Sequence, residues 1–111
     1  MLEEKDWCDE DTSRELWQLG LVPDTYYDGP IVLLYEAQKF LIDKFNLYIS
    51  IHLVSSTAMM ELQRCNPGWS NDRRTIHSRF FIIDENFKHE YILLEGIKDA
   101  IKYIKQNNLD K

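Results

Sequence analysis

The sequence predicts an α+β domain in which two long helices lie on one face of a three-stranded antiparallel sheet, in the order α-β-β-β-α. An apolar stripe with a 3.6-residue period runs from Leu33 to Phe45 and indicates a helix. Beyond Asn46, strict alternation from Leu47 to Val54 indicates a strand. A second amphipathic stripe from Leu93 to Lys105 closes the chain. A sheet with one oily face needs such a cover.

The first long helix has signals at both ends. Asp28-Gly29-Pro30 offers an acceptor and then a proline where no amide donor is needed, and Asn46 is suited to a left-handed stop. In the strand that follows, one face is apolar and is expected to meet the helices: Leu47, Ile49, Ile51 and Leu53. The opposite, outer face carries Tyr48, Ser50 and His52.

A short helix is expected before these elements. Thr12 and Glu15 match a capping box, so we expect a helix over Ser13 to Leu19 that Gly20 ends in the left-handed conformation. This helix would dock at an edge of the sheet. Residues 1–11 are expected to form an acidic, mobile leader, and residues 12–108 a single domain.

The other two strands and the last helix follow from weaker patterns. Residues 57–64 alternate between apolar and polar, although their composition also suits a helix, and we interpret them as a strand. Ile76 to Ile83 is rich in β-branched and aromatic residues and is also expected to be a strand. Phe87 to Tyr91 would add a short extended piece. Gly96 in the last helix marks either close packing against the sheet or a tolerated defect.

Composition sets the broad class. The chain has 111 residues, 44% of them hydrophobic, which suits one domain with a real core. Two cysteines do not make a disulfide scaffold, and reduced thiols favour a cytoplasmic protein. The acidic start is not a signal peptide, and no apolar stretch is long enough to span a membrane. Of the net charge of −6, residues 1–15 hold seven acids and two bases, so the body is nearly neutral.

An arginine-rich stretch is the strongest polar cluster. Arginine forks suit phosphate and carboxylate, and a tryptophan can stack on a base. The alternative is a solvated loop and strand face, which is the usual fate of short charge runs, or a contact with the chain's own acidic leader. The residues of this candidate basic patch are Arg64, Trp69, Arg73, Arg74, His77 and Arg79.

The outer face of the sheet is the second candidate site. We expect it to join Tyr48, Ser50 and His52 with His77, Arg79, Phe81 and Ile83 of the last strand. Phe81 and Ile83 are apolar where water is expected, which is typical of a partner surface. The alternative is that the N-terminal helix or the 65–75 loop covers them.

Catalysis, metals and cofactors are not expected. The three histidines have no zinc-like spacing with a cysteine or with each other, and the four glycines form no phosphate loop. Nothing positions a nucleophile, a base and an oxyanion hole together. Enzymatic activity stays open only if a deep pocket gathers His52 or His77 with carboxylates.

The sequence resembles two known groups of proteins. The order α-β-β-β-α is similar to that of double-stranded RNA-binding domains, whose second helix begins with a basic cluster. Here that place reads Leu93-Leu94-Glu95-Gly96-Ile97-Lys98, with a single lysine, so no RNA-binding residue is carried across.

The chain also resembles a group of small uncharacterised proteins of gut Bacteroidales and their phages or mobile elements. The matching segments cover most of the chain: Leu16 to Leu21, Tyr26-Tyr27, Phe40 to Ile51 and Tyr91 to Ile104. A phenylalanine, Phe40, stands where the group has tryptophan, and the 65–75 loop is longer. The resemblance implies a cytosolic, phage-derived accessory protein and no assigned activity.

From the sequence, therefore, we expect a non-enzymatic module that self-associates or binds another protein through the outer face of the sheet. The alternative is a nucleic-acid or phosphate-ligand binder that uses the arginines, with steep salt dependence.

Overall fold

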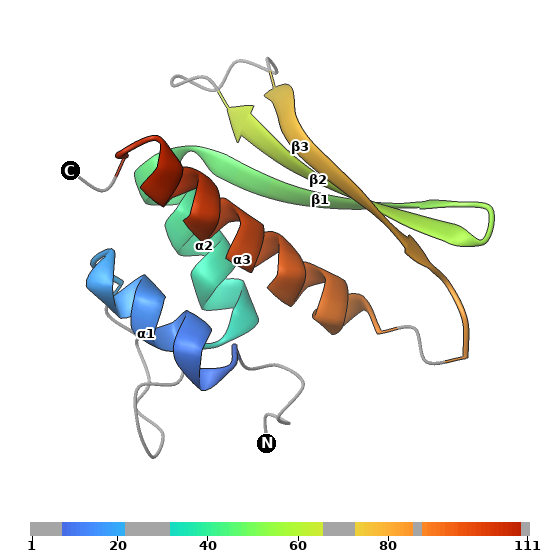
Figure 1. The fold of residues 1–111 in the computed structure, drawn as a ribbon, viewed down its shortest axis with the longest axis horizontal. Coiled ribbons are helices and arrows are strands. Elements are labelled where there is room, and N and C mark those ends of the chain that lie inside the picture. The colour runs from blue at the N-terminus through green and yellow to red at the C-terminus, as the bar shows by residue number, and fades with distance from the viewer. Residues whose placement is uncertain (1–7, 22–31, 66–72, 86–87, 110–111) are drawn as a thin grey trace.

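The chain folds into three helices and a three-stranded antiparallel sheet, which confirms the predicted α+β class and the order α-β-β-β-α (Figure 1). The structure is a computed structural model that describes residues 8–21, 32–65, 73–85 and 88–109. Asp28-Gly29-Pro30, Tyr26-Tyr27 and most of the acidic leader lie outside these ranges. The first long helix has its N-cap at Leu33, so the expected entry at Asp28-Gly29-Pro30 is wrong. The elements are α1 (Glu10–Gln18), α2 (Leu34–Phe45), β1 (Leu47–Val54), β2 (Thr57–Cys65), β3 (Arg73–Ile82) and α3 (His89–Gln106).

The junction between α2 and β1 turns on one left-handed residue. Asn46 has φ 58° and ψ 34°, and its N–H donates to the carbonyl of Ile42 at 3.1 Å, as the sequence predicts for a helix stop. The Asn46 carbonyl then accepts from the N–H of Cys65 at 2.8 Å. The same residue therefore ends the helix and aligns β1 with the far end of β2.

The core lies between the sheet and the two long helices. β2 is a strand as expected, with Ala58, Met60 and Leu62 fully buried beneath the helices. A Cβ atom on Gly96 of α3 would come within 2.7 Å of Ile49 Cγ2 on β1. Gly96 thus permits close packing of the helix against the sheet, the first of the two interpretations of this glycine.

The sheet is longer than its helical cover. Its order is β1-β2-β3, and the hairpin between β1 and β2 projects beyond the end of α3 (Figure 1). Leu47 and Ile49 are buried as expected, but Leu53, on the same face of β1, is 66% exposed. The prediction that the helices cover the apolar face as far as Leu53 is wrong, because neither α2 nor α3 extends as far as the tip of the hairpin.

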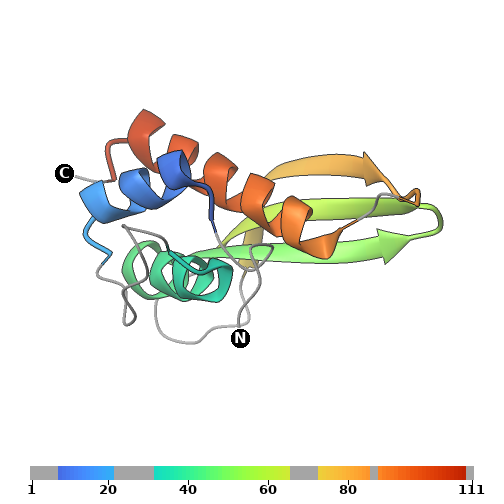
Figure 2. The same ribbon diagram turned by 90° about the horizontal axis from the view of Figure 1, so that it is seen from below.

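The N-terminal helix begins earlier than the sequence predicts. Asp9, not Thr12, is the N-cap, and its carboxylate accepts from the Thr12 N–H at 2.7 Å. Gly20 has φ 110° and the Leu21 N–H donates to the Leu16 carbonyl, so the predicted glycine stop is confirmed. α1 lies beside α3 in the helical layer rather than at an edge of the sheet (Figure 2).

The boundary of the acidic leader shifts accordingly. Cys8 is buried, its N–H donates to the Val32 carbonyl at 2.8 Å, and residues 10 and 11 belong to α1. Residues 8–11, which the sequence analysis assigns to the leader, are therefore part of the fold.

Two further boundaries differ from those expected. α3 starts at His89, so Tyr91 is helical and the expected extended piece ends before it. β3 starts at Arg73 and contains a bulge at Ile76, since Leu62 pairs with His77 while Gln63 pairs with Thr75. The bulge changes which side chains of β3 share a face with those of β2.

Candidate functional site

The last strand presents the opposite face from the one predicted. Arg79 pairs with the buried Met60, and Phe81 pairs with the buried Ala58, so both point toward the helices. The Phe81 ring meets Tyr91 of α3 edge to face, with centroids 6.3 Å apart. The placement of His77, Arg79, Phe81 and Ile83 on the outer face is therefore wrong. Whichever alternate set of residues faces the helices, that set contains one phenylalanine and at least one isoleucine. The alternation of side chains alone therefore does not determine which set is buried.

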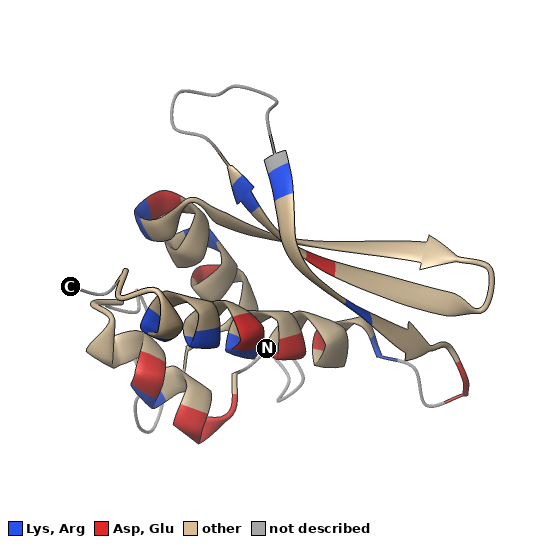
Figure 3. Ribbon diagram, turned by 45° about the horizontal axis from the view of Figure 1, so that its top comes forward, with Lys and Arg blue, Asp and Glu red and all other residues tan. Residues whose placement is uncertain are grey.

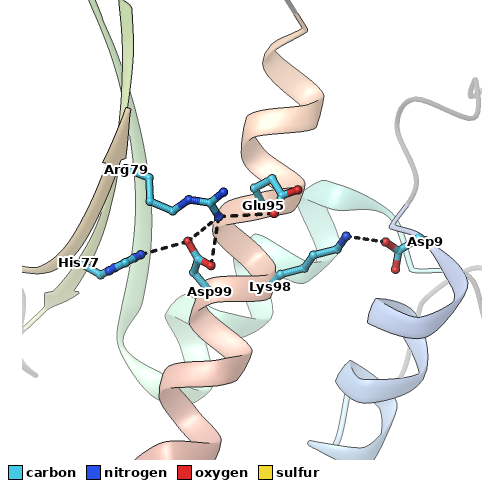
Figure 4. Close-up of polar contacts among 6 residues, drawn as sticks. All are labelled: Asp9, His77, Arg79, Glu95, Lys98 and Asp99. Atoms are coloured by element: carbon cyan, nitrogen blue, oxygen red, sulfur yellow. Dashed lines mark hydrogen bonds and ion pairs between the residues drawn. The ribbon is translucent and has the colours of Figure 1, made fainter. Parts of the chain in front are cut away.

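Ion pairs with α3 favour the observed orientation of β3, in which Arg79 and His77 face the helices. Arg79 Nη1 donates to Asp99 at 3.1 Å and to Glu95 at 3.5 Å, and His77 Nε2 lies 3.3 Å from the Asp99 carboxylate (Figure 4). The hydrogen bond to Asp99 raises the pKa of Arg79, against the opposing effect of burial, and the charge of Glu95 adds to the rise. The guanidinium also lies 5.1 Å from the centroid of Phe81. The carboxylates of α3 thus provide partners for Arg79 and His77 on the partly buried side of β3.

The outer face has a polar end near the start of β1. Ser50 Oγ lies 2.6 Å from His52 Nε2, and that nitrogen lies 3.5 Å from a Glu61 carboxylate oxygen. Gln63 donates to the same Glu61 oxygen at 3.0 Å. Tyr48 pairs with Gln63 and belongs to the same face. Of the four predicted outer-face residues, Tyr48, Ser50 and His52 do share this face, while Phe81 does not.

The other end of the outer face is apolar and uncovered. Ile82 is 81% exposed and Phe80 is 66% exposed, and the neighbouring Val54 is also exposed. The register places Thr57 between Val54 and Ile82, and Met59 between His52 and Phe80. We call the set Val54, Met59, Phe80 and Ile82 the apolar end. Contiguous exposed apolar side chains of this kind mark contact surfaces more often than isolated ones do.

Sequence reasoning missed the apolar end, although a signal for it exists. Phe80 to Ile83 are four consecutive apolar residues, so any strand phase turns two of them outward. The pattern indicates an exposed pair, and the contacts of Arg79 and Phe81 with α3 identify that pair as Phe80 and Ile82.

The candidate basic patch does not form one surface. Arg64 and Arg74 are exposed cross-strand partners at one end of the sheet, whereas Arg79 lies five residues further along β3 and is ion-paired to α3 (Figure 3). His77 joins Arg79 rather than the other arginines. Trp69 and the side chain of Arg73 lie outside the described residues. What remains is a pair of arginines rather than a patch of four.

A second set of ion pairs holds α1 against α3. Lys98 Nζ lies 3.0 Å from Asp9 (Figure 4), and Lys105 Nζ lies 3.1 Å from Glu15. Burial acts to raise the pKa of Asp9, but hydrogen bonds from Thr12 and Lys98 outweigh it and hold that pKa below its ordinary value of 3.8. The hydrogen bond to Asp9 likewise raises the pKa of Lys98. α1 is therefore held at both ends by charge as well as by packing.

Cys8 lies just before the N-cap of this helix and is buried. Burial, with smaller contributions from Asp9 and the buried carboxylate of Glu36, raises the pKa of Cys8 to about 12. A thiol of that kind is protonated and unreactive near neutral pH. It does not match a catalytic nucleophile.

Two grooves flank α3. The larger, about 440 Å³, runs between α1 and α3, and its charged lining largely consists of the ion pairs already described. The smaller, about 240 Å³, brings His77 and Asp99 together with Lys102 and Tyr103. Its volume lies below the range of roughly 300–1,000 Å³ that is usual for small-molecule sites, and Arg79 occupies the Asp99 carboxylate. Such a groove can hold a water or a small ion, but it does not assemble a nucleophile with an oxyanion hole.

Metal binding finds no support in the described ranges. There, no three histidine, cysteine or carboxylate side chains gather closely enough to bind a metal ion. His52 and His77 lie on opposite faces of the sheet, on strands separated by β2.

No family model, curated protein or solved structure is significantly similar to the chain. Among the described helices, none has the length and apolar content needed to cross a bilayer.

Proposed function

We propose that the protein is a non-enzymatic interaction module that associates with a second copy of itself through the apolar end of the sheet. The observation that carries this proposal is the exposure of Phe80 and Ile82 on the face that also carries the exposed Val54 and the partly exposed Met59. Removing a large apolar side chain from water contributes about 1.5–3 kcal/mol. A surface with several such side chains therefore favours association strongly enough to offset part of its entropic cost.

The charge of the outer face also favours a second copy as the partner. In a two-fold interface, residues close to the axis meet copies of themselves, so a contact surface with few charges near its centre suits such an interface. Among the described side chains at strand positions of this face, the acidic and basic residues are Glu61 and His52, which lie beside each other, and Arg73 pairs with Cys65 at the opposite end of β3 from Phe80 and Ile82. Most of the acids behind the net charge of −6 therefore lie away from the apolar end, and salt screens their repulsion between two copies.

The molar mass of the protein as a function of concentration tests the proposal. We expect the mass to rise toward twice that of the chain, and the double variant Phe80→Ser/Ile82→Ser to remain at the mass of one chain. Tyr35→Ser is the matched control, because Tyr35 of α2 is 62% exposed and lies outside the apolar end. A wild-type protein that keeps the mass of one chain at every concentration would sink the proposal.

Anion binding is a second candidate function, supported by the pairing of Arg64 with Arg74. Like charges directly opposite each other on neighbouring strands are destabilising, and a bound phosphate would relieve that repulsion. Under this alternative, phosphate or a short oligonucleotide would stabilise the wild-type protein at low salt and not the Arg64→Ala variant. Arg14→Ala is the control, since Arg14 pairs with Glu10 on α1 instead. Equal stabilisation of both variants would remove this candidate.

The cellular setting is also a proposal. The two cysteines are free, which suits a reducing cytosol, and the resemblance to small Bacteroidales and phage proteins suits an accessory role. Neither observation indicates a biochemical activity. The self-association surface therefore remains the feature that experiments should address first.

A further inference from the structure

The two edges of the sheet differ in how they are protected. On β1, Gln38 of α2 donates its side-chain N–H to the Ile49 carbonyl at 3.2 Å and so occupies part of that edge. β3 forms the other border, and within the described ranges no strand pairs with its outer side. An open edge strand presents unpaired backbone groups that can bind another strand.

The hydrogen-bonding pattern identifies which groups of β3 point outward. The Ile83 N–H donates to the Ser56 carbonyl at 2.8 Å, so Ile83 points toward β2. In an antiparallel pair, successive residues alternate in direction, and residues 81 and 79 therefore also point toward β2. The backbone groups of Ser78, Phe80 and Ile82 consequently point away from the sheet.

Only the first half of this edge carries protection against pairing. The bulge at Ile76 twists the strand, and Arg74 adds an exposed charge. From Ser78 to Ile82 there is neither proline nor lysine, and Arg79 is turned to the acids of α3. The same segment supplies Phe80 and Ile82 to the apolar end, so its backbone and its side chains are exposed together.

We infer that two copies of the chain join by pairing residues 78–82 of β3 with each other in an antiparallel arrangement, about a two-fold axis at Phe80. This inference rests on the self-association proposed above and specifies its geometry: Phe80 and Ile82 of the apolar end contact the second copy along the edge, whereas Val54 and Met59 lie on the other two strands. The register pairs Phe80 with its own copy and Ser78 with Ile82 of the second copy. It uses all three outward-pointing residues, allows about six backbone hydrogen bonds, and makes one six-stranded sheet.

Charge along the strand supports the antiparallel direction. Arg74 lies at the start of β3 and Glu85 lies just past its end, so the strand is basic at one end and acidic at the other (Figure 3). Antiparallel pairing at this register brings Arg74 of one copy near Glu85 of the other. A parallel arrangement would instead place like charges together at both ends.

A proline at Ser78 tests the edge directly. Its N–H is not used within the sheet, so proline is compatible with the folded chain but blocks strand pairing. We expect Ser78→Pro to weaken dimerisation by about a hundredfold or more, whereas Ser78→Ala should dimerise like the wild type. Urea unfolding of both variants establishes that each is folded.

Three outcomes separate the inference from the function on which it rests. Dimeric Ser78→Ala with monomeric Ser78→Pro supports edge pairing. If folded Ser78→Pro dimerises as well as Ser78→Ala while Phe80→Ser/Ile82→Ser does not, the edge inference is overturned and association through the face stands. A monomeric wild-type protein overturns both.

A second pair of variants covers the case in which Ser78→Pro does not fold. Ile82 is the last residue of β3 and its N–H also points outward, so Ile82→Pro disturbs the sheet less. Its match is Ile82→Ala, which removes the same apolar side chain but keeps the N–H. Edge pairing predicts a lower affinity for Ile82→Pro than for Ile82→Ala, and equal affinities would contradict it. If neither proline variant folds, the amide exchange of the wild-type chain decides.

Discussion

Arg79 of β3 and Asp99 of α3 are joined by a hydrogen-bonded ion pair of 3.1 Å that ties the edge strand to the helix packed against it. Asp99 also contacts His77, and Arg79 also reaches Glu95, so the pair is the centre of a small network. This network, together with the packing of Phe81 against Tyr91, favours the orientation of β3 in which Arg79 faces the helices. In that orientation, Phe80 and Ile82 point to the outside.

The Arg79–Asp99 pair should contribute a measurable coupling energy. Both side chains are partly exposed, which screens the interaction, so a double-mutant cycle with Arg79→Met and Asp99→Asn is expected to give about 0.5–1 kcal/mol. The free energy of unfolding in urea is the measurement. The Arg14–Glu10 pair on the surface of α1 is the comparison and should give less. Equal coupling in the two cycles would contradict the special role of Asp99.

Substitution of Gly96 tests the close approach of α3 to β1. Alanine would ordinarily stabilise a helix, but here its Cβ would lie 2.7 Å from Ile49 Cγ2. We expect Gly96→Ala to lower the free energy of unfolding by about 1–3 kcal/mol. The double variant Gly96→Ala/Ile49→Ala should be less unstable than the sum of its parts, because the clash is gone. Additive effects would show that the two residues do not meet.

The charge of Asp9 should make stability depend on pH in the acid range. The pKa of Asp9 is lower in the folded state than its ordinary value of 3.8, so protons bind the unfolded chain more readily. The stabilisation is therefore fully present well above pH 3.8, and it is lost as the pH falls through the folded-state pKa of Asp9. Asp9→Asn keeps a capping side chain but not the charge. Its deficit in unfolding free energy should be constant near neutral pH and shrink in acid, and a deficit independent of pH would be inconsistent with this account.

The two cysteines should differ in reactivity toward a thiol reagent. Cys8 is buried with its pKa raised to about 12, whereas Cys65 is partly exposed at the end of β2. At pH 8 we expect one thiol to react quickly and Cys8 to react only when α1 opens. Lys98→Met removes the ion pair to Asp9 and should accelerate the slow reaction, while Lys39→Met on the exposed surface of α2 should not. Labelling of both thiols at one rate in the folded protein would contradict the burial of Cys8.

The sequence predicts the fold where periodicity is unambiguous. The helix-to-strand change at Asn46 and the glycine stop at Gly20 depend on local backbone geometry, which sequence patterns encode well. The sequence predicts the N-cap at Thr12 rather than Asp9 because both residues are good caps followed by acids, and the contact of Asp9 with Lys98 of α3 is a long-range feature that local patterns do not encode.

The candidate site is less predictable because it depends on long-range contacts. The orientation of β3 depends on contacts of Arg79 with Asp99 and Glu95, which are sixteen or more residues away in the chain, and on the packing of Phe81 against Tyr91. The bulge at Ile76 also shifts the register, and no single-residue signal marks it. Phe80, one position before Phe81, therefore lies on the outer face where Phe81 is predicted.

Amide hydrogen exchange of the wild-type protein at rising concentration tests the central claim most directly. Self-association along β3 predicts that exchange at Ser78, Phe80 and Ile82 slows as concentration rises, because their N–H groups become bonded to the second copy. The amides of Arg79 and Phe81, which already face β2, should be protected at every concentration. Rapid exchange at Phe80 and Ile82 that does not change with concentration would contradict the account.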